Sequence, residues 1–214
     1  MASQITIEIK DGKEISITQG SQDYNEPIYS ASPNGEYYFS AGTWYTASSD
    51  SDVIILCTNH DILFKKKFDL SEDSIFISRV FDNGLVLICT ENGVIILYDI
   101  TGKQIYKSKT QIYAESGSCG ITPDFLYLFG EVDNDKSDQY GLHILPFTEM
   151  KHIKVNLPPH EYFYIEDEEL CTDTAYPEKI SVADHTITVY YDDPDCTTIL
   201  FDGNGKAISV SKGK

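Results

Sequence analysis

Apolar residues along this chain occur in short runs that return every ~8 to 12 residues. Isoleucine, valine, tyrosine, phenylalanine and threonine dominate the runs, whereas glycine, asparagine, aspartate and proline cluster between them. Such runs are typical of β-strands, and almost no segment has the period of an amphipathic helix. The pattern therefore predicts an all-β fold.

The strands form a repeat of four that returns four times along the chain. It is clearest over residues 81–106, where Asn-Gly and Thr-Gly pairs separate the runs. Glycine in these pairs provides the positive φ that tight hairpin turns need. The third strands begin at residues 53, 94, 142 and 197, at spacings of 41, 48 and 55 residues. A period of about 40 to 50 residues with four strands per repeat is typical of β-propeller blades.

We therefore expect residues 1–214 to form a single small β-propeller domain, with blades near 28–69, 70–110, 111–157 and 175–212. Several strands are apolar on both faces, as expected where neighbouring blades cover each side of a sheet. The predicted core consists of Ile54, Leu56, Phe76, Val86, Ile88, Ile95, Leu97, Leu126, Leu128, Leu142, Ile144, Ile187, Val189, Ile199 and Phe201.

Two segments lie outside this repeat. Residues 4–18 alternate around Asp11-Gly12 and predict an N-terminal hairpin, and residues 158–174 form an extra segment between the third and fourth repeats. Either the two pieces help to make a fifth blade, or four blades close the ring and the pieces decorate it. We favour five blades, because five repeats in this chain give a usual blade length of about 43 residues.

Two stretches resemble known propeller families. Residues 32–42, Ser-Pro-Asn-Gly-Glu-Tyr-Tyr-Phe-Ser-Ala-Gly, look like the first turn and second strand of a WD-repeat blade. Residues 92–103, Asn-Gly-Val-Ile-Ile-Leu-Tyr-Asp-Ile-Thr-Gly-Lys, are similar to the third strand and following turn of WD-repeat and quinoprotein-type propellers. The Trp-Asp and Gly-His pairs of WD repeats are missing, and the only tryptophan is Trp44. The resemblance implies propeller architecture.

The chain is strongly acidic, with 34 acidic against 16 basic residues and a formal net charge of −18. Nucleic acid is not an expected partner, because binding a polyphosphate requires clustered lysine and arginine. The only basic run, Lys65-Lys66-Lys67, is interpreted as the charged edge of an outer strand that prevents unwanted pairing. A field this negative would steer a basic protein or a cation toward the surface.

The sequence also indicates the cellular compartment. The amino terminus has no basic segment followed by an apolar stretch, and no run of apolar residues is long enough to span a membrane. Five cysteines are scattered without a Cys-x-x-Cys spacing, as expected for reduced thiols. These features predict a cytoplasmic protein without a membrane partner.

Candidate chemistry is sparse. Asp133, Asp135 and Asp138 place carboxylates at the short spacing that Ca²⁺ requires, although a solvated hairpin tip is the favoured interpretation. Asp184-His185 could orient an imidazole, but it occupies a turn position of the repeat. No nucleophile motif, phosphate loop or zinc-protease motif occurs. We therefore expect no catalytic residues and no cofactor other than this candidate Ca²⁺ site.

The segment over residues 161–173 is the candidate interaction surface, because it combines tyrosines with acids and is not needed to propagate the repeat. The predicted partner-binding residues are Tyr162, Tyr164, Glu166, Asp167, Glu168, Glu169 and Asp173.

The leading hypothesis is a non-enzymatic propeller that binds a basic protein through this acidic, tyrosine-bearing face. An immunity or inhibitor protein that neutralises a cationic bacterial toxin fits the small size and the negative charge. One alternative is a small-molecule-binding or hydrolytic propeller with a cation in its central channel. Another alternative is a scaffold with several partners. The oligomeric state stays open.

Overall fold

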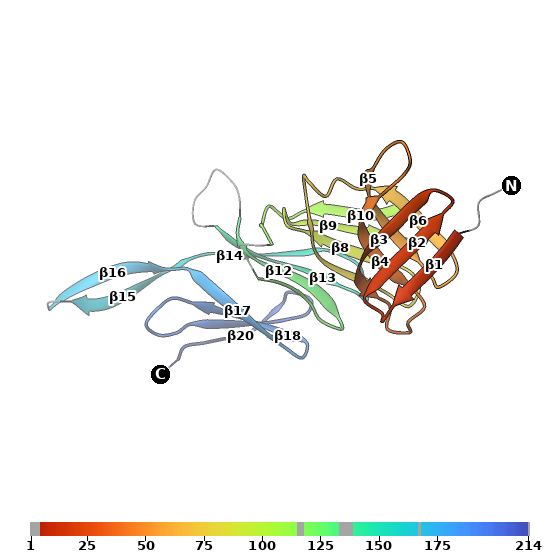
Figure 1. Cartoon of the computed structure of the whole chain (residues 1–214). Helices are drawn as coiled ribbons and strands as arrows, with labels where there is room; N and C mark the ends of the chain where they lie inside the picture. Colours follow the sequence, from red (N-terminus) through yellow and green to blue (C-terminus); the bar gives the residue numbers. More distant parts are fainter. Residues whose placement is uncertain (1–4, 115–117, 133–138, 167, 214) are drawn as a thin grey trace. The chain divides into compact units, whose positions relative to one another are not determined.

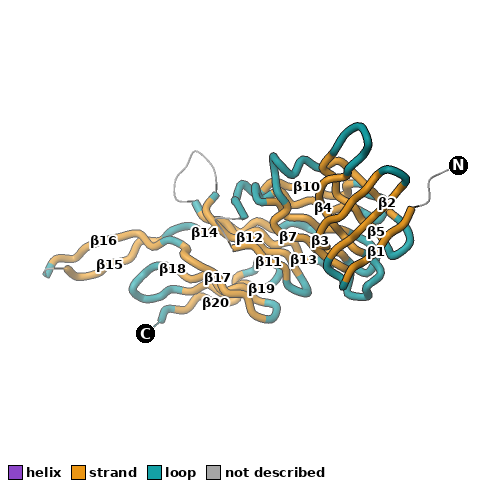
Figure 2. The backbone as a smooth tube through the Cα atoms, in the orientation of Figure 1, coloured by secondary structure: helices purple, strands orange, loops and turns teal. Residues whose placement is uncertain are grey.

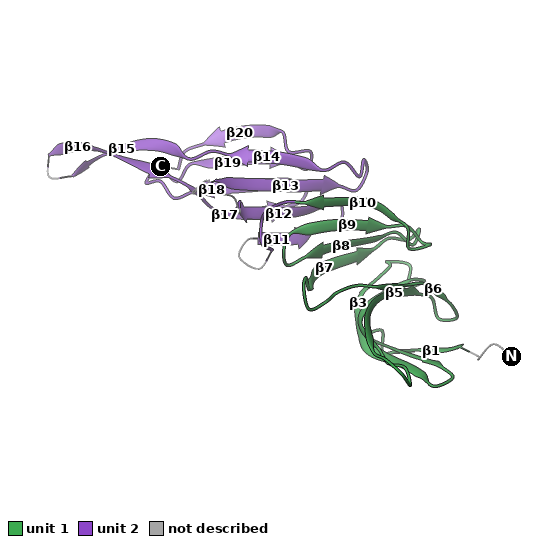
Figure 3. Ribbon diagram, turned by 90° about the horizontal axis from the view of Figure 1, so that it is seen from above, with its two compact units in different colours: residues 1–109 green, residues 110–214 purple. Residues whose placement is uncertain are grey.

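The computed structural model of the chain describes residues 5–114, 118–132, 139–166 and 168–213. Throughout these ranges every regular element is a β-strand, joined to the next by turns and loops (Figure 2). The chain divides into two compact units, residues 1–109 and 110–214 (Figure 3). Among the residues that the structure describes, no helix is long and apolar enough to cross a membrane. The predicted all-β fold is confirmed.

Unit 1 contains a six-stranded sheet in the order β1-β2-β3-β4-β5-β6 and a four-stranded sheet in the order β10-β9-β8-β7. All neighbouring strands are antiparallel. The strands are β1 (Ile5–Lys10), β2 (Glu14–Gln19), β3 (Gln22–Ala31), β4 (Tyr38–Trp44), β5 (Ser51–Cys57), β6 (Ile62–Lys67), β7 (Ile75–Val80), β8 (Val86–Thr90), β9 (Val94–Tyr98) and β10 (Gln104–Lys109).

The hairpin turns have the chemistry that the repeat predicted. Between β9 and β10, one carboxylate oxygen of Asp99 accepts hydrogen bonds from the Thr101 amide, the Thr101 hydroxyl and the Lys103 amide. Gly102 follows with a φ of 78°, a conformation that glycine adopts without steric cost. The Asp202 carboxylate makes the corresponding bonds between the last two strands of the chain. These turns fix the register of the outer strands.

The two sheets of unit 1 share an apolar core. Ile54 and Leu56 of β5 are fully buried against Val86 and Ile88 of β8, within a cluster that also contains Phe39. Such close face-to-face packing of adjacent antiparallel sheets is what the two-sided apolar pattern predicted.

The N-terminal hairpin covers the other face of the first blade. Ile15 and Ile17 of β2 are fully buried with Trp44 and Ile55, in a second cluster that lies on the opposite side of β5. β3 connects the hairpin to the rest of the first sheet, because its first half pairs with β2 and its second half pairs with β4. The hairpin is therefore part of the hydrophobic core of unit 1.

Unit 2 contains two four-stranded antiparallel sheets, β11-β12-β13-β14 and β17-β18-β19-β20, and a separate two-stranded sheet, β15-β16. Its core lies between the two four-stranded sheets and includes Phe125, Leu142, Ile187 and Val189. The strands are β11 (Ser118–Ile121), β12 (Phe125–Glu131), β13 (Tyr140–Pro146), β14 (Ile153–Leu157), β15 (His160–Glu166), β16 (Glu169–Ala175), β17 (Pro177–Ala183), β18 (Thr186–Tyr191), β19 (Thr198–Asp202) and β20 (Ala207–Ser211).

The four predicted repeats form four antiparallel sheets, of which three have four strands and the first has six; β5, β9, β13 and β19 are the third strands of the repeats. The two extra segments do not pair with each other in a fifth sheet. Instead, β1 and β2 continue the first sheet, while β15 and β16 form a sheet of their own. The preference for five blades was based on length alone, and length does not determine which strands pair.

One predicted core residue is wrong. Phe76 is 43% exposed, although its neighbour Ile75 is buried. The register of β7 against β8 shifts between Ile75 and Ile77, so the strict alternation of buried and exposed positions is interrupted at Phe76. A register shift of this kind leaves no mark in the apolar pattern.

Candidate functional site

The candidate site is the hairpin formed by β15 and β16, which extends beyond the blades of its own unit (Figure 1). Seven residue pairs connect the two strands, from His160 opposite Ala175 to Glu166 opposite Glu169. Their alternating polar and apolar residues form a ribbon with two distinct faces, because successive side chains of a strand point to opposite sides.

One face carries Tyr162, Tyr164, Glu166, Glu169 and Asp173, and we call it the acidic tyrosine face. Its three carboxylates are exposed and its two tyrosines are partly exposed. The hydroxyl of Tyr162 donates a hydrogen bond to the Asp173 carboxylate at 3.4 Å, and the two tyrosine rings lie 6.0 Å apart.

Both tyrosines of this face stay protonated at neutral pH. Partial desolvation and the neighbouring Asp173 carboxylate raise the pKa of Tyr162. The negative charge of Glu166 is the main cause that raises the pKa of Tyr164. The face thus offers aromatic rings beside carboxylate acceptors, a combination that suits cationic side chains.

The opposite face of the hairpin carries three exposed apolar residues beside Glu161, Thr172 and Thr174, and sequence reasoning missed them. Phe163, Ile165 and Leu170 are 65%, 76% and 73% exposed, and Ile165 lies directly opposite Leu170 across the two strands. We call these three residues the apolar face. The alternation of Tyr162, Phe163, Tyr164 and Ile165 is the sequence signal from which the apolar face could have been predicted.

The base of the hairpin is held to the fourth blade. His160 contacts the Asp193 carboxylate at 2.8 Å, and the Asp193 side chain is only 1% exposed. Burial alone would raise the pKa of Asp193, but hydrogen bonds from Thr197 and His160 hold it below its usual value. The Tyr191 hydroxyl donates to the Pro158 carbonyl, and Ala175 is fully buried. The hairpin is therefore anchored at its base, and the adjacent Tyr162 packs against the core of unit 2.

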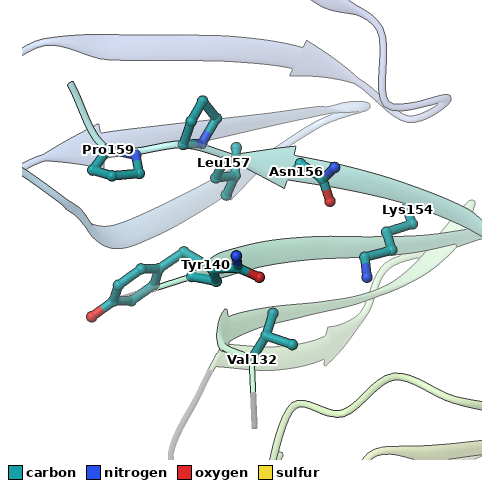
Figure 4. Close-up of a pocket in the computed structure, with 8 residues that line it drawn as sticks. Val132, Tyr140, Lys154, Asn156, Leu157 and Pro159 are labelled. Carbon is teal, nitrogen blue, oxygen red and sulfur yellow. The ribbon is translucent and has the colours of Figure 1, made fainter. Parts of the chain in front are cut away.

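Two grooves lie near this base. One has a volume of about 220 Å³ and is lined by Tyr140, Lys154, Asn156 and Leu157 among others (Figure 4). Its volume is below the roughly 300–1,000 Å³ of usual small-molecule sites. The other has a volume of about 310 Å³, at the lower end of that range. This second groove has mainly apolar walls and is lined by Val155, Leu157, His160, Ile199, Phe201 and Val210.

The structure brings most of the predicted partner-binding residues together. Tyr162, Tyr164, Glu166, Glu169 and Asp173 share one face, whereas Glu168 lies in the turn with a φ of 68°. Asp167 lies outside the described residues.

The predicted Ca²⁺ ligands, Asp133, Asp135 and Asp138, also lie outside the described residues. Within the described ranges no cluster of three or more histidine, cysteine or acidic side chains is arranged to hold a metal ion. Asp184 occupies the β17–β18 turn with a φ of 51°, and the Nδ1 atom of the neighbouring His185 contacts the Asp124 carboxylate.

Comparisons with known proteins found similarity only at the level of structure, because no family model and no curated protein matches the chain. The structure is similar to BamB from Moraxella catarrhalis, with a TM-score of 0.47, 15% identity and coverage of 98% of this chain and 63% of that one. It is also similar to the C-terminal WD40 domain of Sif2, with a TM-score of 0.36, 11% identity and coverage of 99% and 73%.

A further similar structure is that of BBS1N in complex with ARL6DN, with a TM-score of 0.36, 11% identity and coverage of 98% and 67%. The chain spans 63% of the BamB chain and 65% of a eukaryotic initiation factor chain, less than two thirds of each.

Proposed function

We propose that this chain is a non-enzymatic protein-binding module, and that the acidic tyrosine face of the β15–β16 hairpin binds a basic protein. The observation that carries the proposal is the sorting of side chains on this hairpin. Three exposed carboxylates and two tyrosines lie on one face, and residues 160–175 contain no lysine or arginine.

The free energy of exposed ion pairs is large enough for the three carboxylates around the two tyrosines to contribute to binding. Each exposed ion pair contributes about 0.2–1 kcal/mol, so three pairs contribute about 0.6–3 kcal/mol, or roughly a 3- to 150-fold gain in affinity. The net charge of −18 adds long-range attraction that accelerates association with a basic partner at low salt. Affinity and association rate should both decrease as ionic strength rises.

Among protein-binding modules, we propose that this chain is an immunity or inhibitor protein that neutralises a cationic bacterial toxin. A strongly acidic surface that covers a basic active site is a direct way to block such a toxin. Support for this finer role comes from the charge and from the location of the acids on an anchored hairpin. The scaffold alternative differs in predicting several partners that do not compete with one another.

The test uses two variants that remove the same charge. One carries Glu166→Gln, Glu169→Gln and Asp173→Asn on the acidic tyrosine face. The control carries Glu8→Gln, Asp50→Asn and Asp61→Asn, three exposed acids elsewhere on the chain. A basic protein captured from the source lysate is identified by mass spectrometry and purified, and its affinity for each variant is measured by calorimetry at low and moderate salt.

We expect the hairpin variant to bind about tenfold or more weakly than the control variant. Equal weakening by both variants would show that only net charge matters and would refute the assigned face. Retention of full affinity by the hairpin variant would refute it as well. Several captured partners that bind without competition would favour the scaffold.

A further inference from the structure

The hairpin has two unpaired edges. β15 and β16 hydrogen-bond to each other, and no other described strand pairs with either of them. A two-stranded ribbon is marginally stable alone in water, and an unpaired edge is a template for another strand. The hairpin is therefore structurally prepared to accept a third strand.

Cationic side chains defend most of the other sheet edges, but the outermost strands β11 and β20 carry none. Lysine on an edge strand opposes pairing with a foreign strand. The outermost strands that carry at least one lysine are β1, β6, β10, β14 and β17. β15 and β16 carry none and contain no proline. β15 and β16 carry acidic side chains instead, which repel an acidic strand and attract a basic one.

The two faces of the hairpin determine what such a strand must look like. Along β15 the side chains alternate between Tyr162 and Tyr164 on the acidic tyrosine face and Phe163 and Ile165 on the apolar face. A strand added at this edge presents its own side chains alternately to the same two faces. Basic residues would then lie beside Tyr162, Tyr164 and Glu166, with the carboxylates of β16 one strand farther away, and apolar residues would cover the exposed Phe163 and Ile165.

We propose that the partner binds as a third β-strand along the free edge of β15, through a segment in which basic and apolar residues alternate. This inference rests on the proposed function and specifies its recognition mode. β15 is chosen over β16 because aromatic and β-branched cross-strand neighbours stabilise pairing most, and β15 supplies four of them. Pairing with the same hairpin of a second copy is opposed by like charge, since that hairpin carries the same acids.

The probe is a capped synthetic peptide, Lys-Val-Lys-Ile-Lys-Val-Lys, compared with a peptide of the same composition in the order Lys-Lys-Val-Val-Ile-Lys-Lys. Two further versions of the first peptide carry N-methyl groups on either the odd or the even residues. N-methylation blocks the hydrogen bonds of one strand edge only. Affinities for the whole chain are measured by calorimetry, and amide hydrogen exchange is measured by mass spectrometry with and without peptide.

We expect the alternating peptide to bind more than tenfold more tightly than the rearranged one, since only it can place charge and apolar groups on separate faces. One N-methylated version should lose at least tenfold in affinity and the other should retain it. Amides of β15 that point outward should become protected from exchange, whereas the outward amides of β16 should not.

Equal binding of the two peptide orders would overturn the proposal, and so would absence of binding by the alternating peptide. Full binding by both N-methylated versions, or protection of β16 instead of β15, would overturn it too. Each of these results leaves the proposed function intact if the captured basic protein still depends on Glu166, Glu169 and Asp173. Loss of that dependence would instead refute the proposed function.

Discussion

Replacing Ile17 by alanine tests whether the N-terminal hairpin is part of the core of unit 1. Ile17 has no exposed surface and lies in one cluster with Tyr24, Trp44 and Ile55. The substitution removes three carbon atoms, each worth about 0.8 kcal/mol of transfer free energy, and it leaves a cavity. We expect the free energy of unfolding to fall by about 3–4 kcal/mol, within the range of about 2–5 kcal/mol usual for buried isoleucine.

Trp44 provides the assay, because it is the only tryptophan and is 2% exposed in the same cluster. Its fluorescence reports on unit 1 during urea unfolding, while far-ultraviolet circular dichroism reports on all strands. At a slope of about 1.5 kcal/mol per molar urea, the expected loss moves the midpoint down by about 2–2.7 M. Because the chain has two compact units, the two signals are fitted separately.

The control is Ile5→Ala in β1, where the side chain is 38% exposed. Its expected cost is below about 1 kcal/mol, because much of the isoleucine already contacts water. A cost below about 1 kcal/mol for Ile17→Ala, or equal costs for the two variants, would refute the reasoning. The hairpin would then be an appendage and not a part of the core.

Two further predictions concern a turn and a buried histidine. Gly84→Ala should cost at least about 1 kcal/mol more than Gly35→Ala, because both glycines have positive φ but only at Gly84 would the new Cβ lie 2.8 Å from Ile100; equal costs in urea unfolding would contradict this. Burial lowers the pKa of His143 to about 4, so the unfolded chain binds this proton near pH 6.5 and the folded chain only near pH 4. Stability should therefore fall as the pH decreases from about 6.5 to 4, and His143→Gln should remove part of this decline. Circular dichroism unfolding at pH 7 and 4.5 compares this variant with the unaltered chain, and an unchanged decline in His143→Gln would contradict the prediction.

The repeating part of the fold could be predicted because its signals are local. Asn83-Gly84 and Thr101-Gly102 form turns with positive φ at the glycine, and the apolar runs between them became buried strands. Turn chemistry and alternation depend on residues within a few positions of each other, so one sequence contains them. The register shift at Phe76 depends on how β7 meets β8, and therefore no local signal announced it.

Only the acidic tyrosine face of the candidate site could be predicted from the sequence. Tyr162, Tyr164 and the acids were chosen for their composition, and the structure adds that five of them share a face. The exposure of Phe163 and Ile165 depends on whether another element packs on that side of the hairpin. Such packing is a tertiary property, and the sequence pattern is the same for a covered and an uncovered apolar face.

The two hairpins outside the repeat make this contrast concrete. Both alternate apolar and polar residues, yet Ile15 and Ile17 of the first are fully buried, whereas Phe163 and Ile165 of the second are 65% and 76% exposed. The first hairpin is joined through β3 to the sheet that it covers, and the second is held only at its base, where His160 meets Asp193. Exposed apolar groups of this size are costly in water unless a partner covers them. The exposed apolar groups of the second hairpin are accordingly one reason to propose that it binds a partner.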